Sequence, residues 1–391
     1  MIGNNLEWIT TENTHEETWR RLLEYANIEL AYNAIEKRHG KATKNTKKNY
    51  LKQAEQIRVS LLQAKEYFEA SKYSSLMTQP NHLYYGSVAL TTACMLLLGG
   101  GNKSLDLLRK DNRNSHHGLN FTFSSNLQKS KENTNLLENS FVQIFKNGHF
   151  FNWYSTLKKE QSNFATFINT ENGSTTRNFD KVGHYNISDF ESLVNKKYSL
   201  IELINNLPDL QNDLNRFEFD IYSTRGQHKV FANHDEKIQR QEFIFHSAQT
   251  PEVLDDIISN FIMDDKKVKL RIEKHNSSNS CAVAYQTELN YKYQLTYPDS
   301  RFTLDNDSIY FKDPFETPEV IDLFMINFAL SMMSRYYPDI WVSFLESHCI
   351  GAKLVERLVR IFTLKIPFLV LNQMSSEEIT ISNHKPPWHV N

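Results

Sequence analysis

The stretch Leu107–Phe121 contains the side chains of this chain that are best suited to acid–base chemistry. Arg109 comes first, and the adjacent His116 and His117 follow it, just before a glycine. A histidine with a pKa of about 6.5 can take up or release a proton near neutral pH. An arginine can hold a phosphate with two parallel N–H donors. Together these side chains have the chemistry needed to cleave a phosphodiester, with a histidine as general acid or base.

Arg109 and His116 stand as R-x6-H after an amphipathic helical hairpin, a pattern that resembles the HEPN ribonucleases. The resemblance implies a metal-independent endoribonuclease in which Arg109, His116 and, as the alternate, His117 are catalytic. Two other interpretations stay open. His117-Gly118-Leu119 also fits a structural turn in which a histidine caps backbone groups, and the loop also fits a partner-binding segment. The "LNFTF" after Gly118 reads as extended, whereas the ribonuclease histidine usually stands at a helix start.

A basic run lies closer to the N-terminus, between residues 36 and 52. It contains one acidic residue and seven basic residues, which are Lys37, Arg38, Lys41, Lys44, Lys47, Lys48 and Lys52. Each cation could make a salt-sensitive phosphate contact, and a solvated loop between helices explains the run equally simply. The candidate nucleic-acid-binding residues are Lys41, Lys44, Lys47, Lys48 and Arg113. This interpretation gains weight only if the run lies on the same face as Arg109 and Arg113.

Two aromatic clusters and one cysteine suggest further chemistry. His149–Ser155 and Ser334–Trp341 could stack on bases, although such clusters more often belong to a core or a domain interface. Glu346, His348 and Cys349 suggest a metal ligand set or a reactive thiol. Because no second ligand pair has metal spacing and Cys349 sits in an apolar pattern, we expect a packed cysteine and no metal.

Composition indicates a folded and nearly neutral chain. The 391 residues are 40% hydrophobic and include 25 Phe and 18 Tyr, enough to bury a sizeable core. The formal net charge is −2, so any nucleic-acid contact must come from a local patch. Three widely spaced cysteines fit a reducing compartment. We see no signal-peptide pattern, and the apolar stretch "GSVALTTACMLLLGGG" is too short to span a bilayer, so we expect a cytoplasmic protein without membrane contact.

Several enzyme signatures are absent from the sequence. There is no G-x-x-x-x-G-K-[ST], no G-x-G-x-x-G, no G-x-S-x-G and no H-E-x-x-H motif. ATP-driven, dinucleotide-dependent, α/β-hydrolase and zincin chemistry therefore lack support in the sequence, and we expect no cofactor.

Apolar spacing predicts helices in the first third of the chain. One should run from Thr14 to Gly40, opened by a capping box of Thr14 and Glu17. A second should run from Lys47 to Ser71, and a third, apolar nearly all round, from Pro80 to the glycines at 99–101. Residues 102–186 are polar and read as loops or insertions around an ordered aromatic stretch. A further helix should follow within residues 187–214.

The pattern then changes to alternating apolar and polar residues, typical of antiparallel strands with one wet face. We expect strands in residues 216–223, 228–233, 241–248, 267–275, 281–288, 291–297 and 307–313. One helix should interrupt them at 250–261, and helices should return at 317–347 and 351–374, the first capped by Thr317. These elements predict an α+β fold with domains at 1–213, 214–313 and 314–391, whose first and last helices pack together.

Four blocks of sequence resemble the YaaC-like proteins of bacteria. They are residues 63–97, the "HHGL" at 116–119, "NFALSMMSRYYPDIW" at 327–341 and "IPFLVLNQM" at 366–374. The resemblance implies a cytoplasmic bacterial protein with helices before and after a mixed middle, and it carries no established reaction. Proteins of this type can sit in multi-gene cassettes, including phage-defence ones.

The sequence therefore leads to two functional expectations. The first is a binding or regulatory subunit that works through a protein partner or as a homo-oligomer, in a phage-defence or stress cassette. The alternative is the HEPN-like endoribonuclease, with RNA as its substrate.

Overall fold

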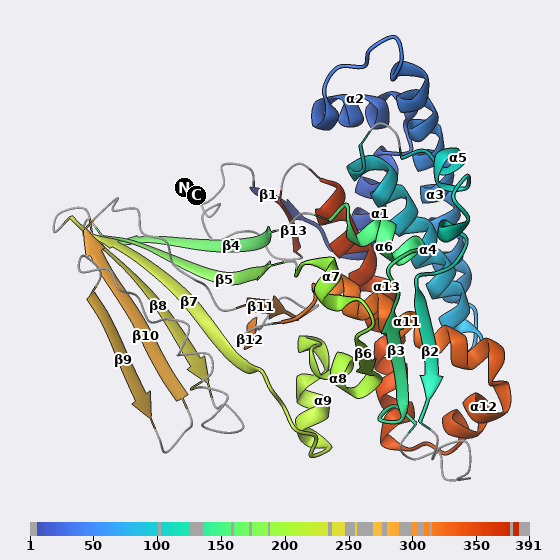
Figure 1. The fold of residues 1–391 in the computed structure, drawn as a ribbon. Helices are drawn as coiled ribbons and strands as arrows, with labels where there is room; N and C mark the ends of the chain where they lie inside the picture. The colour runs from blue at the N-terminus through green and yellow to red at the C-terminus, as the bar shows by residue number, and fades with distance from the viewer. Residues whose placement is uncertain are drawn as a thin grey trace.

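The computed structural model combines a helical body with a curved antiparallel sheet at its side (Figure 1). The structure describes residues 6–100, 103–124, 136–157, 160–171, 174–186, 188–233, 237–246, 255, 269–275, 280–288, 299–303, 309–312, 315–375 and 378–382. Helices at both ends of the chain surround strands in the middle, which confirms the α+β fold class.

The first four helices form one side of the helical body. They are α1 (Thr14–Glu24), α2 (Ile28–His39), α3 (Lys47–Ser71) and α4 (Gln79–Leu98). The predicted bounds of α3 are confirmed, and α4 begins one residue before Pro80 and ends at Gly99. α3 buries one stripe of apolar side chains and α4 is buried almost all round, as their patterns predict.

The single helix predicted from Thr14 to Gly40 is wrong, because the chain turns between α1 and α2. Asn27 caps α2 by accepting hydrogen bonds from the backbone N–H groups of Glu29 and Leu30. The cap of α1 is also shifted by one residue, since Asn13 accepts from the backbone N–H of Glu16 at 3.1 Å. Asparagine competes well for such orphan donors, and both caps use it.

Three helices close the other side of the body: α11 (Glu319–Tyr336), α12 (Pro338–Glu346) and α13 (Ile350–Met374). α4 packs against both α11 and α13, so the predicted packing of the first and last helices is confirmed. The continuous helix predicted over 317–347 is wrong, because it breaks at Tyr337 before Pro338. Thr317 does not cap α11; its hydroxyl donates to the buried carboxylate of Asp322.

A small sheet and several short helices lie against α11. The sheet has the order β2-β3-β6, and its strands are β2 (Leu119–Phe123), β3 (Ser140–Ile144) and β6 (Lys197–Ser199). The short helices are α5 (Leu105–Leu108), η1 (Asn112–Asn114), α6 (His149–Tyr154), α7 (Phe190–Leu193), α8 (Leu200–Asn205), η3 (Pro208–Leu210) and α9 (Gln211–Arg216). The helix expected within 187–214 is thus divided into short pieces with β6 between them. The extended "LNFTF" is confirmed as β2.

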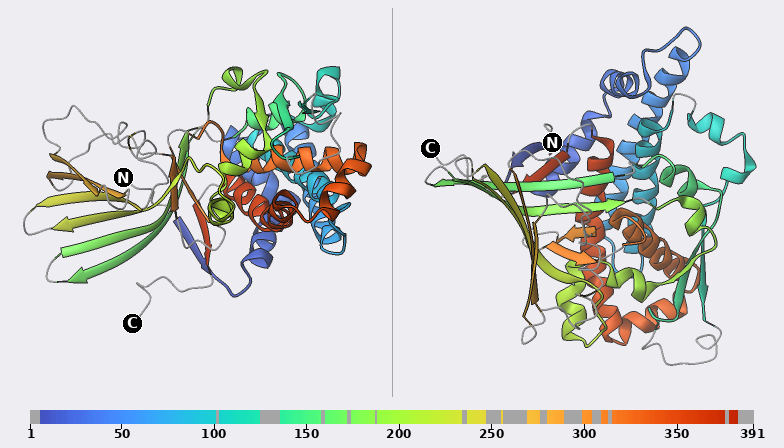
Figure 2. Two further views of the ribbon diagram at one scale, coloured as in Figure 1. Left: turned by 90° about the horizontal axis from the view of Figure 1, so that it is seen from below. Right: turned by 60° about the vertical axis from the view of Figure 1, so that its left-hand side comes forward.

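The large sheet has the order β11-β12-β7-β8-β10-β9, and a hairpin of β4 and β5 joins it through β7 (Figures 1 and 2). Its strands are β4 (Glu160–Glu171), β5 (Ser174–Asn186), β7 (Thr224–Asn233), β8 (Ile238–His246), β9 (Lys269–His275), β10 (Ser280–Glu288), β11 (Asp299–Phe302) and β12 (Ile309–Lys312). All pairings of its described strands are antiparallel, as expected.

Two sequence expectations for this region are wrong. The stretch containing β4 and β5 was predicted as loop, but it pairs with β7, and such pairing depends on tertiary context that composition does not report. Residues 216–223 were predicted as a strand, but they follow the end of α9 and β7 begins only at Thr224. The predicted strand at 291–297 lies outside the described residues, as does the helix at 250–261 apart from Asp255. The domain division at 213 and 313 stays a prediction, and sheet pairing crosses residue 213.

Buried ion pairs connect the large sheet with the helices. Arg301 of β11 lies 2.8 Å from Asp322 of α11, and both side chains are fully buried. Lys365 of α13 lies 2.6 Å from both Asp209 and Glu319. Burial disfavours the charge on Lys365, but the two carboxylates outweigh that effect and raise the pKa of the lysine. Removal of one partner would leave a buried charge uncompensated.

A parallel pair of strands links the two ends of the chain. β1 (Leu6–Thr10) pairs with β13 (Glu378–Ser382) in register from Leu6 opposite Glu378. Ile379 and Ile381 of β13 are buried in the same core as the helices. The sequence pattern did not predict this pair.

Candidate functional site

The segment after α4 is fixed to α3 by a set of polar contacts. The side-chain oxygen of Gln56 accepts from the backbone N–H of Leu105 at 2.8 Å, and its amide donates to Asp106 at 2.7 Å. Lys52 forms an ion pair with the same Asp106 at 2.8 Å. α5 therefore lies beside the N-terminal half of α3, next to the turn that joins α2 to α3.

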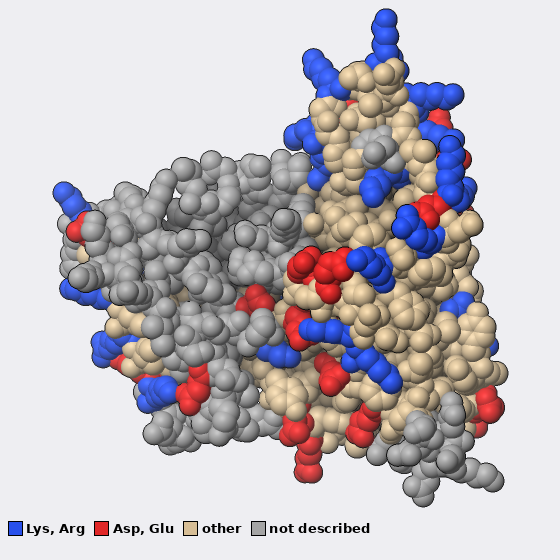
Figure 3. Space-filling model, in the orientation of Figure 1, with Lys and Arg blue, Asp and Glu red and all other residues tan. Residues whose placement is uncertain are grey.

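Exposed cations gather at this end of the helical body. Figure 3 shows lysine and arginine side chains clustered at its upper right, over the α2–α3 turn and α5. We define the basic end as Lys41, Lys44, Lys47, Lys48, Arg109 and Lys110, all of which are exposed. Within the described residues none of these six forms an ion pair, whereas Arg113 is paired with Asp111 at 2.7 Å. The structure thus brings Arg109 to the basic run and ties Arg113 to its own loop.

Two lysines of the basic end occupy the first turn of α3. Lys47 and Lys48 stand at the positive end of the helix dipole, where acids are favoured and α3 has none. The preceding Thr46 makes no side-chain capping bond. Helix stability therefore does not explain these lysines.

The two candidate histidines sit in a tight turn. Nδ1 of His116 accepts a hydrogen bond from the backbone N–H of Gly118 at 3.0 Å, while the rest of His116 is exposed. The carbonyl of His116 accepts from the backbone N–H of His149 at 2.9 Å. Gly118 and Gly148 have φ values of +80° and +98°, and a Cβ on Gly148 would lie 2.6 Å from the Gly118 nitrogen. This is the geometry of the structural turn, with a histidine holding backbone groups.

His117 faces the core on the other side of that turn. Its Nδ1 lies 2.9 Å from the hydroxyl of Tyr84, and its ring packs against Tyr84 and Phe328. Burial lowers the pKa of His117, and the nearby positive charge of Arg335 lowers it further. His117 therefore stays neutral at pH 7.

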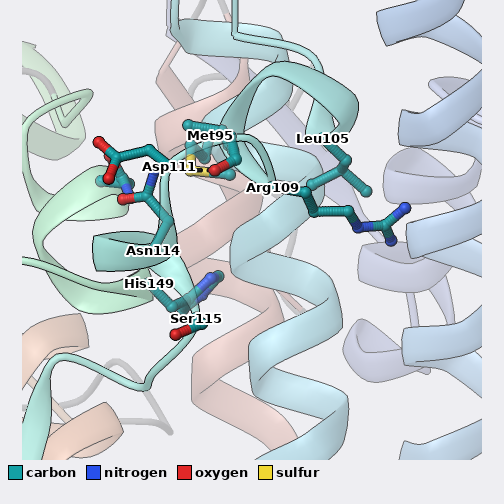
Figure 4. Close-up of a pocket in the computed structure, with 9 residues that line it drawn as sticks. Met95, Leu105, Arg109, Asp111, Asn114, Ser115 and His149 are labelled. Atoms are coloured by element: carbon teal, nitrogen blue, oxygen red, sulfur yellow. Dashed lines mark hydrogen bonds between the residues drawn. The ribbon is translucent and has the colours of Figure 1, made fainter.

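A cavity of about 240 Å³ lies beneath α5 and η1 (Figure 4). Its lining residues come from α4, the α5–η1 segment and α6: Met95, Leu105, Leu108, Arg109, Asp111, Asn114, Ser115, His149 and Asn152. Arg109 thus shares a cavity with His149, and neither His116 nor His117 lines it. In Figure 4 the side chain of Arg109 points away from Asp111, Asn114 and His149. The catalytic assignment of Arg109, His116 and His117 stays a hypothesis.

His149 is the residue of this cavity that sequence reasoning missed. Its Nε2 lies 2.8 Å from the hydroxyl of Thr91 in α4. Burial lowers the pKa of His149 to about 4, with a smaller contribution from His117. The available signal was a histidine after Gly148 at the start of an aromatic helix, but only the fold places that helix against α4.

The aromatic clusters divide into buried and exposed members. Phe150, Trp153 and Trp341 are buried, and Tyr154 is almost so, which is the core role that their clusters favoured. Tyr336, in contrast, is 62% exposed.

Tyr336 belongs to a group of exposed and half-buried side chains at the end of the body opposite the α2–α3 turn. We define this tyrosine end as Tyr67, Tyr73, Met77, Tyr85, Arg335 and Tyr336. The α3–α4 turn is tied there to α11 and α12. The Ser334 hydroxyl of α11 donates to the carbonyl of Met77, and the Trp341 indole of α12 donates to that of Leu76 at 3.2 Å.

Arg335 organises the tyrosine end. Its guanidinium lies 5.2 Å from the ring centre of Tyr85 and 5.1 Å from that of Tyr336, and it donates a hydrogen bond to the hydroxyl of Tyr85. Tyr67 stacks on Tyr85 at 5.9 Å. Cation–π and stacking contacts hold these exposed rings in fixed positions.

The described residues contain no group of three or more His, Cys, Asp and Glu side chains that could hold a metal ion. Cys349 is free and partly buried, and it stands at the N-cap position of α13 without a side-chain capping bond. Among the helices of the described part of the chain, none is both long and apolar enough to cross a bilayer.

Comparison with known proteins gives one result. No curated protein and no solved structure matches the chain. No comparison gives a HEPN ribonuclease, so that resemblance stays a hypothesis. The profile of one family matches residues 22–374, which span the helical body, both sheets and the cavity. The chain therefore belongs to the YaaC-like protein family.

Proposed function

We propose that this protein is a binding subunit that acts through a protein partner and engages that partner with its tyrosine end. The composition of the surface carries the proposal. Tyrosine, methionine and arginine are the side chains enriched at protein interfaces and at their energetic hot spots. Here Tyr73 is 91% exposed and Met77 45%, beside the exposed Tyr336 and the half-buried Arg335. A cytoplasmic location is part of the proposal, and the free cysteines are compatible with it.

The arrangement of the tyrosine end also supports binding. Asn81 accepts from the Ser331 hydroxyl at 3.1 Å and donates to that of Ser334 at 3.0 Å, so α4 and α11 hold the surface from beneath. Rings that are already fixed lose little conformational freedom when a partner covers them, and a pre-organised surface therefore binds more tightly.

Size-exclusion chromatography of native lysate tests the proposal. Wild-type protein should elute well above its monomer mass, and Tyr336→Ser combined with Tyr73→Ser should shift it towards the monomer. Leu30→Ser is the matched control, because Leu30 is 50% exposed on α2 at the opposite end. Equal elution of all three proteins would contradict the proposal. Light scattering of purified protein separates a partner from a second copy.

The basic end favours a second candidate function, the binding of RNA. Its six cations come from two segments far apart in the sequence, which lie together because α5 is docked on α3 through Gln56 and Asp106. Unpaired exposed lysines at a helix N-terminus are suited to phosphate contacts.

Incubation with total RNA distinguishes binding from cleavage. We expect wild-type protein to shift RNA in a gel without shortening it, in the presence or absence of EDTA. A variant with Lys41, Lys44, Lys47 and Lys48 all changed to Gln should lose the shift. Cleavage by wild type that His116→Ala abolishes would instead establish the ribonuclease hypothesis. Absence of any shift at low salt would remove RNA as a ligand.

A further inference from the structure

The cavity beneath α5 has an apolar side and a polar side. Met95, Leu105 and Leu108 form the apolar side. The polar side comes mainly from the loop around η1 and from α6, whose His149 and Asn152 stand three residues apart and so share one face of the helix. The direction of each hydrogen bond on this side can be assigned from fixed carbonyl acceptors.

Two asparagines form a chain whose polarity is set by backbone carbonyls. The side-chain amide of Asn114 donates to the carbonyl of Leu108 at 3.0 Å, so its oxygen must face Asn152. The amide of Asn152 donates to that oxygen at 2.7 Å and to the carbonyl of Gly148 at 2.9 Å. Both hydrogens of Asn152 are used, and its Oδ1 points the other way as an acceptor. Asn152 is only 7% exposed.

The tautomer of His149 follows from the same reasoning. The hydroxyl of Thr91 donates its single hydrogen to a backbone carbonyl, that of Ser87 at 2.8 Å or of Val88 at 3.1 Å. Thr91 can then only accept from His149, so Nε2 carries the proton and Nδ1 is an acceptor. The lowered pKa of His149 keeps the ring neutral at pH 7.

Arg109 also lines the cavity, but its side chain points away from the polar side (Figure 4), so that side is rich in acceptors and poor in donors. Neither Nδ1 of His149 nor Oδ1 of Asn152 has a hydrogen-bond partner among the described residues, and the hydroxyl of Ser115 is used on the carbonyl of Asn112. The Asp111 carboxylate adds another acceptor, but Arg113 neutralises its charge at 2.7 Å. An acceptor at the cavity wall that no protein donor reaches is open to a hydrogen-bond donor from a ligand.

We propose that this cavity binds a small neutral molecule that carries an NH₂ group on a flat apolar ring, such as a primary aromatic carboxamide or an amino-heterocycle. The NH₂ group donates to His149 and Asn152, which matches two hydrogens to two acceptors. The ring lies against Met95 and Leu108. Arg109 belongs to both the cavity lining and the basic end, but the unpartnered acceptors belong to neither end, so the ligand proposed here is independent of both functions proposed above.

Binding of benzamide, compared with methyl benzoate, tests the ligand class. The two molecules are similar in size and shape, but methyl benzoate has no N–H donor. Isothermal titration or ligand-observed NMR on the full chain should show benzamide binding at least about tenfold more tightly, as the loss of one or two hydrogen bonds implies. Equal affinities, or no benzamide binding at millimolar concentration, would overturn the proposal.

Two tryptophan variants locate the binding. Leu108→Trp fills the cavity and should abolish benzamide binding, whereas Leu107→Trp, on the same helix but 40% exposed and outside the lining, should retain it. Asn152→Leu should weaken benzamide and leave methyl benzoate unchanged. Binding that survives Leu108→Trp would overturn the site. Tyr336→Ser should bind benzamide normally, so this test and that of the partner proposal can fail independently.

Discussion

The two ends of the helical body expose different chemistry at the two ends of α3. At the basic end, the four lysines between residues 41 and 48, with Arg109 and Lys110 just after α5, offer long cationic side chains without ion pairs among the described residues. At the tyrosine end, Arg335 holds the rings of Tyr85 and Tyr336, and Tyr67 stacks on Tyr85. Mobile charges attract any polyanion and respond to salt, whereas fixed rings select a partner by shape. We therefore expect the two ends to respond differently to every perturbation that leaves the body intact.

The largest expected effect is a loss of folding stability, which would disrupt both ends together. Lys365→Met leaves Asp209 and Glu319 buried without their cation and should lower the free energy of unfolding by about 3–5 kcal/mol. Urea unfolding followed by circular dichroism measures it. Lys353→Met, exposed on the same helix, is the control and should change stability by less than about 0.5 kcal/mol. A stable Lys365→Met protein would show that the ion group does not hold the body together.

The second largest effect should be a difference in the salt dependence of binding at the two ends. Raising the salt concentration from about 50 to about 200 mM should weaken RNA binding at the basic end by about 10²–10³-fold, because about six phosphate contacts are lost to competing counterions. Binding of the protein partner at the tyrosine end should change less than about threefold. Fluorescence anisotropy measures the first, and pull-down of the isolated partner measures the second. A similar salt response at both ends would break the comparison.

Replacement of the Arg335 guanidinium should weaken binding at the tyrosine end alone. Arg335→Lys keeps the charge but loses the flat guanidinium that contacts Tyr85 and Tyr336. We expect about tenfold weaker partner binding and unchanged RNA binding. Arg360→Lys, exposed on α13, is the matched control. Unchanged partner affinity in Arg335→Lys would place the interface elsewhere.

Acid should give the smallest effect, again at the tyrosine end. Burial, with help from Lys72, lowers the pKa of His15 to about 4, and burial and Arg335 lower that of His117. Both rings are neutral in the folded state, whereas a histidine of the unfolded chain takes up a proton below its ordinary pKa of 6.5. Protonation therefore favours the unfolded state. The folded state has its full stability above pH 6.5 and loses part of it as the pH falls towards 4.

Hydrogen exchange between pH 7 and pH 4.5 checks this expectation. Exchange, corrected for its intrinsic pH dependence, should rise first in the C-terminal half of α3 and the start of α4, and later in the α2–α3 turn. His15→Gln should reduce that early rise, and His348→Gln, exposed before α13, should not. Uniform opening along α3 would contradict the assignment.

The sequence by itself determined the elements whose cause is local. The apolar stripe of α3 predicted its bounds from Lys47 to Ser71, and Pro80 and Gly99 marked the limits of α4. The exposed basic turn after Gly40 was also evident, because charge and periodicity are read from neighbouring residues. The same reading selected Arg109, His116 and His117 by type and spacing alone.

The tertiary structure decided everything that depends on distant partners. β4 and β5 are strands because they pair with each other and β7, although their composition reads as loop. Arg109 lies at the basic end because Gln56 of α3 holds the start of α5 beside α3. Arg109 also lines the same cavity as His149. A local sequence pattern indicates on which face of a helix or strand a residue lies, but not which distant residue packs against that face. Hydrogen-bond partners, buried ion pairs and cavities all depend on these distant neighbours.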